Sequence, residues 1–426
     1  MIVLALFVLA LVMLVLGFEM LLVMGVPALL AKWIFFRDMP EILSVQKMLG
    51  GVQVVTLLAI PFFIFAADVM SHGQIATRLT EMVRRLIGHY RGGLGHATVV
   101  SMMTFGAISG SAPATVAALG RLTHPELVRA GYRERFSLGL IASSAECALL
   151  IPPSITFIIY GWLTGTSIAA LFAGGLVVGV VLGLAFMALV QFETWRSGAK
   201  AADAPQPGER WRAVRRGLLG VFVAGLVLVG IYAGFFTATE AAAVAVVLAL
   251  FVELFVYRSL TLRDVARIAE GSAVTTVVVF VLLAMGTFLS TILTLADVHT
   301  KILSWIQATG LDWITFLLIV NAILFIAGMF VDPNSILLLL VPVLFPVAQS
   351  LGIDPVHFGI LVTLNICIGM ITPPFGLDLF VASSTLRRPV EVVIAGVWPF
   401  VLTNIAVLAI VSYVPQISTA LPRLIL

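Results

Sequence analysis

Long apolar segments follow one another along most of this chain, and short polar loops separate them. The runs lie at about 1–30, 51–70, 137–165, 168–192, 217–235, 239–257, 273–295, 358–383 and 392–415. Two further apolar stretches, 96–120 and 312–348, contain glycine, proline and polar residues in their middle. A helix that crosses a bilayer needs about 20 apolar residues, so the pattern predicts an all-α polytopic membrane protein with roughly ten spans.

Two of these apolar segments resemble each other at a separation of 221 residues. Gly131 lies 21 residues before the pair Pro152-Pro153, and Gly352 lies equally far before Pro373-Pro374. Each proline pair interrupts an apolar segment, 137–165 or 358–383. Corresponding interruptions in two halves of a hydrophobic chain are typical of secondary transporters, which bind their substrate at broken helices. We therefore expect two broken helices at membrane depth.

The basic residues indicate how the segments are oriented. Four arginines precede 96–120 and four follow it: Arg78, Arg84, Arg85, Arg91, Arg121, Arg129, Arg133 and Arg135. Cytoplasmic loops are enriched in Lys and Arg, so 96–120 is predicted to be a re-entrant hairpin that enters and leaves on that side. The loops around 312–348 hold one basic residue, Lys301. A second hairpin is therefore expected there, entering from outside, which makes the second repeat inverted.

These observations divide the chain into five predicted segments. They are an N-terminal span with an interfacial helix (1–50), the first repeat (51–190), a flexible basic cytoplasmic linker (191–217), scaffold helices (218–270) and the inverted second repeat (271–426). The apolar run 1–30 has one charge, Glu19, so a single retained span is expected in place of a cleaved signal peptide.

One group of basic residues does not fit the orientation. Lys32, Arg37 and Lys47 would lie outside the cytoplasm in this topology. An interfacial helix at 31–49 would tolerate them, with Asp38 and Glu41 as partial compensation.

Composition and charge limit the classes of function that the chain can have. The chain has 426 residues, of which 61% are hydrophobic and 11% charged, and a formal charge of +3. The basic residues lie in loops and form no single patch, which argues against nucleic-acid binding. None of the four lysines follows a glycine, so a phosphate-binding GxxxxGK[ST] loop is absent from the sequence. Transport must then use an ion gradient or a separate ATPase subunit.

The polar residues at the interruptions suggest a sodium site in each half. Unwound backbone at membrane depth leaves carbonyl oxygens without partners, and a hard cation such as Na⁺ prefers oxygen ligands. The candidates of the first half are Ser109, Gly110, Ser111, Ser143 and Ser144; those of the second are Asp332, Asn334, Asn365 and Thr372. The half-helices that begin near Ser154 and Phe375 have partial positive N-termini, which suit an anionic substrate.

Simpler explanations remain open for individual residues. Small residues such as Gly106, Gly110 and Gly120 often only allow membrane helices to pack closely. Asp332 could cap a helix. Glu146 is ionisable at depth, which favours a functional role, yet a buried structural hydrogen bond would also explain it. The recurrence of tip, polar position and proline pair at one spacing favours a functional site.

With these motifs, the sequence resembles the large membrane subunit of tripartite ATP-independent periplasmic (TRAP) transporters, the DctM-like proteins. The resemblance covers essentially the whole chain and is most specific at 106–111, 151–155, 237–243, 351–359 and 371–377. It implies an elevator-type importer of the bacterial inner membrane that takes up small organic acids by sodium symport. It also implies two partners: a small membrane subunit, expected as a separate chain, and a periplasmic substrate-binding protein.

The resemblance also implies site residues by position. The first sodium site would comprise Ser109, Gly110, Ser111, Ser144 and Pro152; the second would comprise Gly328, Asp332, Asn334, Asn365, Thr372 and Pro373. The substrate would contact Ser111, Pro113, Thr115, Ser154, Asn334 and Phe375. The chain departs from the family at 112–115, where a second serine and an aspartate are common. Glu146 is outside the family pattern and receives no role.

Two other classes of protein are less consistent with the sequence. The permease of an ATP-driven importer needs a coupling loop in which glycine follows Glu-Ala-Ala at a set distance. Here no glycine follows Glu240-Ala241-Ala242 before Gly271. An intramembrane enzyme would need a catalytic motif such as HExxH or Gly-x-Ser-x-Gly, and the sequence contains neither. We expect a transporter, not an enzyme.

Overall fold

The computed structural model describes residues 2–298, 300–302, 304 and 310–425 of the chain. These residues form helices joined by short connections, with no strand among them. Eight helical segments of this part are long and apolar enough to cross a membrane. The predicted all-α polytopic fold is therefore confirmed.

The N-terminal region contains two helices where a single span was expected. α1 (Ile2–Val15) and α2 (Met20–Phe35) pack against each other. The prediction of one span over 1–30 is wrong because Gly17 interrupts it with a φ of +77°, a conformation that glycine adopts at no steric cost. α3 (Glu41–Val52) follows, and the buried Lys32 forms an ion pair with Glu41. The expected compensation of this lysine is therefore present.

The first repeat contains one helical hairpin and one broken helix. Its elements are η1 (Val55–Leu58), α4 (Ala59–His72), α5 (Ile75–Ile87), α6 (Gly93–Ser109), α7 (Ala112–Arg129), α8 (Glu134–Ala145), α9 (Cys147–Leu150), α10 (Ile155–Thr164) and α11 (Ile168–Ser197). The hairpin is α6 and α7, with its tip at Gly110-Ser111. The break lies at 151–154, between α9 and α10. Both features match the sequence prediction.

The second repeat has the same order of elements. After α12 (Glu209–Tyr232), α13 (Ala238–Phe251) and the π-helical turn η2 (Val252–Val256) come α14 (Leu262–Leu295), α16 (Trp313–Gly328), α17 (Pro333–Ser350), α18 (Pro355–Met370), α19 (Leu377–Leu386), α20 (Val390–Tyr413) and α21 (Gln416–Ile425). α17 and α18 begin 221 residues after α7 and α8. The second hairpin is α16 and α17, and the second break separates α18 from α19.

Two predicted boundaries differ from the structure. The linker expected over 191–217 is non-helical only at 198–208, because α11 continues to Ser197 and α12 begins at Glu209. Gly198, with a φ of +68°, ends α11. The boundary expected at 270–271 falls inside α14, a single helix that runs through it. Polar residues at these places lie on helices that extend beyond the apolar segments.

The two hairpin tips turn by different means. Gly110 ends α6 with a φ of +59°, and the Ser111 side chain then accepts a hydrogen bond from Ala114 N at 3.5 Å. At the second tip Asp332 caps α17: its Oδ2 accepts from Asn334 N at 3.1 Å and from Ser335 N at 3.2 Å, and its Oδ1 accepts from Ser335 Oγ at 2.5 Å. The interpretation of Asp332 as a helix cap is confirmed.

Each hairpin packs tightly on the broken helix of its own repeat. A Cβ on Gly106 would lie 2.7 Å from Ala148 Cα, and one on Gly328 would lie 2.9 Å from Gly369 Cα. Small residues let membrane helices approach this closely, so close packing is one role of these glycines. A Cβ on Gly110 would lie 2.6 Å from Pro153 O, which places the first tip against the first break.

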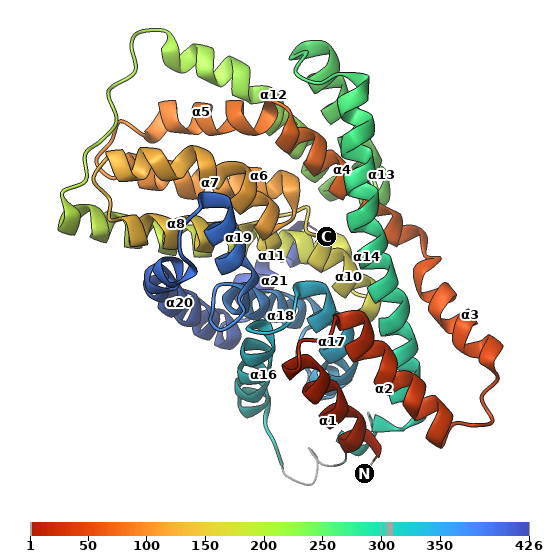
Figure 1. Cartoon of the computed structure of the whole chain (residues 1–426). Helices are drawn as coiled ribbons and strands as arrows, with labels where there is room; N and C mark the ends of the chain where they lie inside the picture. Colours follow the sequence, from red (N-terminus) through yellow and green to blue (C-terminus); the bar gives the residue numbers. More distant parts are fainter. Residues whose placement is uncertain (1, 299, 303, 305–309, 426) are drawn as a thin grey trace.

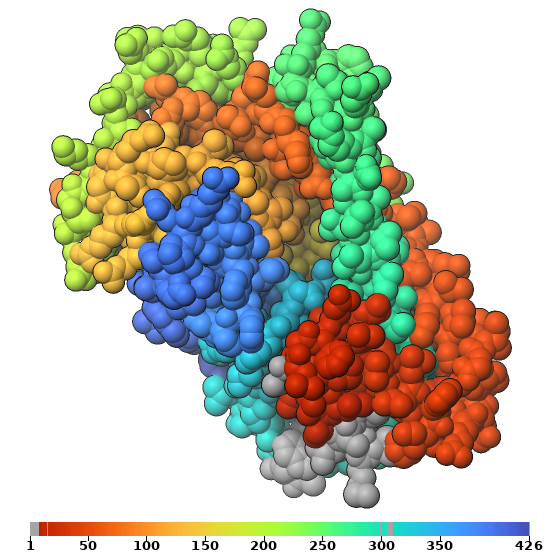
Figure 2. Space-filling view, in the orientation of Figure 1, coloured from red at the N-terminus to blue at the C-terminus, as the bar shows by residue number. Residues whose placement is uncertain are grey.

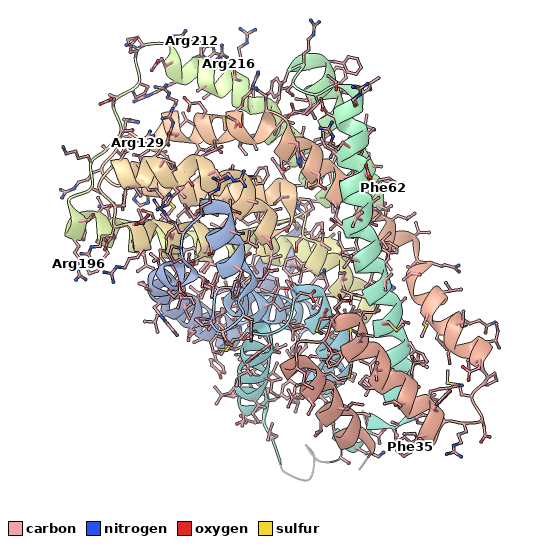
Figure 3. The ribbon with its side chains drawn as sticks, viewed as in Figure 1. Phe35, Phe62, Arg129, Arg196, Arg212 and Arg216 are labelled. Carbon is pink, nitrogen blue, oxygen red and sulfur yellow. The ribbon has the colours of Figure 1, made fainter. Side chains whose placement is uncertain are left out.

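The hairpins approach the middle of the molecule from different directions, as Figure 1 shows. α6 and α7 run side by side from the left of the view, whereas α16 rises from below. The long helix α14 runs down the right side of the view beside α2, α3 and α4, which it contacts, and α3 lies further to the right. In Figure 3, Arg129, Arg212 and Arg216 lie toward the upper left and Arg196 lies at the left edge, while Phe35 lies at the lower right.

Candidate functional site

One cavity of about 300 Å³ joins both hairpin tips to both broken helices. The first tip, the second tip, the two breaks and two outer helices all contribute. The lining residues are Ser109, Gly110, Ser111, Pro113, Ala114, Leu149, Ile155, Thr156, Asp332, Pro333, Asn334, Met370, Leu377, and Ile64, Ala67 and Asp68 of α4 with Thr275 and Val279 of α14. Figure 2 shows the surface hollowed between the green α14 and the orange and blue elements of the two repeats.

Four helix N-termini meet at this cavity. Residues from the first turns of α7, α10, α17 and α19 line it, namely Pro113, Thr156, Asn334 and Leu377. A helix N-terminus has unpaired N–H groups and a partial positive charge, which together favour an anion. None of the described residues that line the cavity is Lys, Arg or His. Any positive potential at the cavity that would favour an anion therefore comes from the backbone.

At the first tip, the hydroxyls of Ser109 and Thr115 and the carbonyl of Ser111 form one hydrogen-bonded group of oxygens. Ser109 Oγ lies 2.8 Å from Thr115 Oγ1, and Thr115 Oγ1 donates to Ser111 O at 2.8 Å. Ser144 is buried and donates to Leu140 O at 2.5 Å. Ser143 Oγ is buried and has no partner among the described residues. Pro152 lies in the adjoining break.

Three candidate ligands of the second repeat, Gly328, Asn365 and Thr372, lie at the end of α16, on α18 and in the second break. The buried Asn365 donates from Nδ2 to Asn321 Oδ1 and to Leu361 O, both at 2.8 Å. Its Oδ1 is buried without a partner among the described residues, and a buried polar atom of this kind is costly unless something binds it. The backbone of Gly328 faces Gly369 near Asn365. Thr372, which precedes Pro373, donates to Ile368 O at 2.6 Å.

These oxygens fit a hard cation by their chemistry. Serine hydroxyls, an amide oxygen and main-chain carbonyls are the ligands that Na⁺-like ions take. Asp332 differs from the others because both its carboxylate oxygens already accept hydrogen bonds at the start of α17. The Oδ1 of Asn365 is therefore the more available oxygen ligand of the second half.

The residues predicted to bind substrate separate into two groups. Ser111, Pro113 and Asn334 line the cavity. Thr115 and Ser154 are buried and are not part of its lining. Phe375 is 61% exposed; its ring centroid lies 5.8 Å from that of Phe330, and its N–H donates to Met329 O at 3.2 Å. Phe375 thus joins the second break to the second tip and does not line the cavity.

Sequence reasoning missed the two polar cavity residues on α4 and α14, Asp68 and Thr275. Asp68 is the one acidic residue of the apolar run 51–70, and its Oδ2 accepts from Ser272 Oγ of α14 at 2.5 Å. Thr275 lies one turn beyond Ser272. A lone acid in an apolar segment is a functional signal, and it could have identified Asp68. Nothing in the sequence places Thr275 next to the tips.

A second acidic group lies deep in the protein. Glu146 is buried and accepts from Asn404 Nδ2 at 3.1 Å, so the hydrogen-bond interpretation of this residue is confirmed. Its Oε1 and both carboxylate oxygens of the buried Asp378 have no partner among the described residues. The two cysteines, Cys147 and Cys367, are free and buried. Cys367 occupies the repeat position of Glu146 and donates to its carbonyl at 3.6 Å.

These features define a multi-pass membrane transport protein with a cavity between two related halves. The model of the family "Tripartite ATP-independent periplasmic transporter, DctM component" matches residues 6–417. The chain belongs to this family, which places it in the bacterial inner membrane. The family is one of large permease subunits that, as the name states, work in three-part transporters.

Several curated relatives match nearly the whole chain. The C4-dicarboxylate TRAP transporter large permease of Rhodobacter capsulatus is 39% identical over 393 residues, 89% of each protein. The ectoine/5-hydroxyectoine permease of Ruegeria pomeroyi is 39% identical over 408 residues, 96% of this chain and 95% of the relative. The sialic acid permease of Vibrio cholerae is 35% identical over 383 residues, 90% of each.

Solved structures support the fold. The YdaH transporter of Alcanivorax borkumensis, described as having an unusual topology, aligns with a TM-score of 0.61 at 14% identity over 87% of each chain. The Neisseria gonorrhoeae MtrF structure aligns with a TM-score of 0.53 at 11% identity, over 87% of this chain and 82% of that one. At these identities the likeness shows the architecture alone.

Proposed function

We propose that this chain is the transporting subunit of a sodium-coupled importer of small organic acids. Its partners would be a small membrane subunit and a periplasmic binding protein that delivers the substrate. One observation carries the proposal: the first turns of four helices and the candidate residues Ser109, Gly110, Ser111, Asp332 and Asn334 of the two hairpin tips line a single cavity. The relatives are named for C4-dicarboxylates, ectoines and sialic acid, all of which contain a carboxylate.

The cation sites would couple the ion gradient to transport. Na⁺ bound at Ser109, Ser111 and Ser144, and at Asn365 and Thr372, would satisfy buried oxygens beside the two breaks. Occupied sites would hold each tip against its broken helix and so fix the helix N-termini around the substrate. Substrate affinity would then depend on sodium, as symport requires.

An elevator movement would complete the cycle. The hairpins and broken helices, α6–α10 and α16–α19, are joined by close glycine contacts and would move as one body. α4 and α14 face them across the cavity and would belong to the stationary scaffold with α2, α3, α12 and α13. The cavity lies between these two groups of helices, where a sliding movement would expose it to each side in turn.

Uptake into proteoliposomes tests the proposal. Both membrane subunits are reconstituted, the binding protein and a radiolabelled organic acid are added outside, and an inward sodium gradient is imposed. We expect accumulation that stops when potassium replaces sodium or when the gradient is collapsed by an ionophore. Accumulation that continues unchanged without the sodium gradient would reject sodium coupling.

A further inference from the structure

The cavity has an acidic wall opposite the helix N-termini. Asp68 of α4 lines the cavity together with Thr275 of α14, while the tips and half-helices form the other side. The described side-chain bond to the Asp68 carboxylate is the one donated by Ser272 Oγ at 2.5 Å. His72, one turn further along α4, lies beside the Asp68 carbonyl, with Nδ1 2.9 Å from that oxygen. No described cationic side chain lines the cavity with Asp68.

The other acid of the cavity is in a different situation. The Asp332 carboxylate accepts three hydrogen bonds at the N-terminus of α17, two of them from backbone N–H groups. The partial positive charge of that helix end stabilises its negative charge. Asp68 has no comparable helix end, because it lies in the interior of α4 (Ala59–His72). Asp68 is therefore the acid that remains available to a ligand.

We propose that the substrate is a zwitterion, with a carboxylate held by the helix N-termini and a cationic group held by Asp68. This inference rests on the proposed function and names the substrate class for the same cavity. A dianion would place its second carboxylate near Asp68 with no basic side chain to balance it, and like charges repel strongly where water is excluded. A cavity of about 300 Å³ suits a compact solute.

The variants that test the inference separate charge from packing. Asp68→Asn removes the charge but keeps an oxygen that can accept from Ser272. Ser272→Ala removes that hydrogen bond and leaves the Asp68 charge in place. If Asp68 served only to hold α4 against α14 through this hydrogen bond, Ser272→Ala would have an effect at least as large as that of Asp68→Asn. If Asp68 binds a substrate cation, only Asp68→Asn should change ligand preference.

Three probes of similar size report ligand preference directly. They are ectoine, which carries a carboxylate and an amidinium; succinate, a dianion; and cyclohexanecarboxylate, a monoanion without a cation. Thermal stabilisation of the purified two-subunit membrane complex is measured in sodium buffer without the binding protein. Ectoine should stabilise the wild type at the lowest concentration. Asp68→Asn should weaken that response by at least about tenfold, the loss typical of a broken buried charge pair, and should leave the response to the monoanion nearly unchanged.

The outcomes distinguish this inference from the function on which it rests. If succinate stabilises the wild type better than ectoine, or if Ser272→Ala reproduces Asp68→Asn, the zwitterion assignment is overturned. It is also overturned if Asp68→Asn abolishes the sodium requirement while the order of the three probes stays the same. Sodium-driven uptake of a dianion in proteoliposomes would leave the proposed function intact and reject only the substrate class. Absence of sodium-driven uptake of any organic acid would reject the function itself.

Discussion

The two hairpin tips occupy the same place in the two repeats but are built differently. The first tip turns through Gly110 and ties its hydroxyls together through Ser109, Thr115 and the Ser111 carbonyl. The second tip is fixed by the Asp332 carboxylate, which caps α17. The two repeats therefore share the position of the turn but not the residues and hydrogen bonds that form it. In the proposed mechanism the tip would supply cation ligands in the first half, whereas the broken helix would supply more of them in the second.

The largest expected effect comes from Gly328 and Gly369, where the second hairpin packs against its broken helix. In Gly369→Ala the new Cβ would lie 2.3 Å from Gly328 Cα, which forces backbone to move and costs about 1–3 kcal/mol or more. Uptake should fall below detection, and the midpoint of thermal unfolding should drop by several degrees. Gly271→Ala on α14 is the matched control, since nothing lies within 4 Å of its added Cβ. Similar losses in both variants would contradict this assignment.

Asn365 should matter more to sodium than its repeat counterpart, Ser144. Asn365→Leu removes the unpartnered Oδ1 and the hydrogen bond to Asn321, so we expect the sodium concentration for half-maximal uptake to rise by about tenfold or more. Ser144→Ala removes one hydroxyl, and a rise of several-fold is expected. The measurement is the sodium dependence of initial uptake rates at saturating substrate. Equal shifts in the two variants would remove the contrast between the halves.

The capping residue of the second tip, Asp332, should contribute more to thermal stability than Ser111 of the first tip. Asp332→Ala removes three hydrogen bonds at the start of α17, whereas Ser111→Ala removes one long bond of 3.5 Å at the start of α7. Loss of a cap costs about 0.5–2 kcal/mol, so Asp332→Ala should lower thermal stability and yield more than Ser111→Ala does. Ser111→Ala should affect sodium dependence more than stability. Fluorescence-detected unfolding of the purified complex provides the comparison, and Asp332→Asn, which keeps an acceptor, should recover most of the stability.

The smallest effect is expected away from both tips. Arg196 is exposed near the end of α11, and Arg210 donates to His89 at 2.8 Å in an exposed position of α12. Exposed interactions of this kind contribute little, so Arg196→Gln and Arg210→Gln should leave uptake within about twofold of the wild type. A loss comparable to that of Ser144→Ala would show that this end of the molecule has a role beyond orientation.

The sequence was sufficient to predict the features that depend on local residue chemistry and recur in both repeats. The breaks at Pro152-Pro153 and Pro373-Pro374 and the turns at both tips follow from residues that cannot continue a helix. The first span and the linker boundaries could not be predicted in the same way. There a single glycine, Gly17 or Gly198, decides where a helix ends, and the apolar pattern does not report it.

The cavity required the three-dimensional arrangement. Asp68 and Thr275 are separated from the tips along the chain and become neighbours only when α4 and α14 pack against the repeats. The Oδ1 of Asn365, which has no partner among the described residues, is equally invisible in the sequence because it depends on where the side chain points. Composition identifies polar atoms at membrane depth, whereas packing decides which of them retain a free lone pair.

Cys147 and Cys367 are fully enclosed, and the chain contains no other thiols. A membrane-impermeant maleimide should therefore find nothing to alkylate on the unaltered permease. One cysteine placed at Ala114 or Thr275 would then report, by its labelling from either face of a vesicle, which compartment the cavity opens to, without a reactive background to remove beforehand.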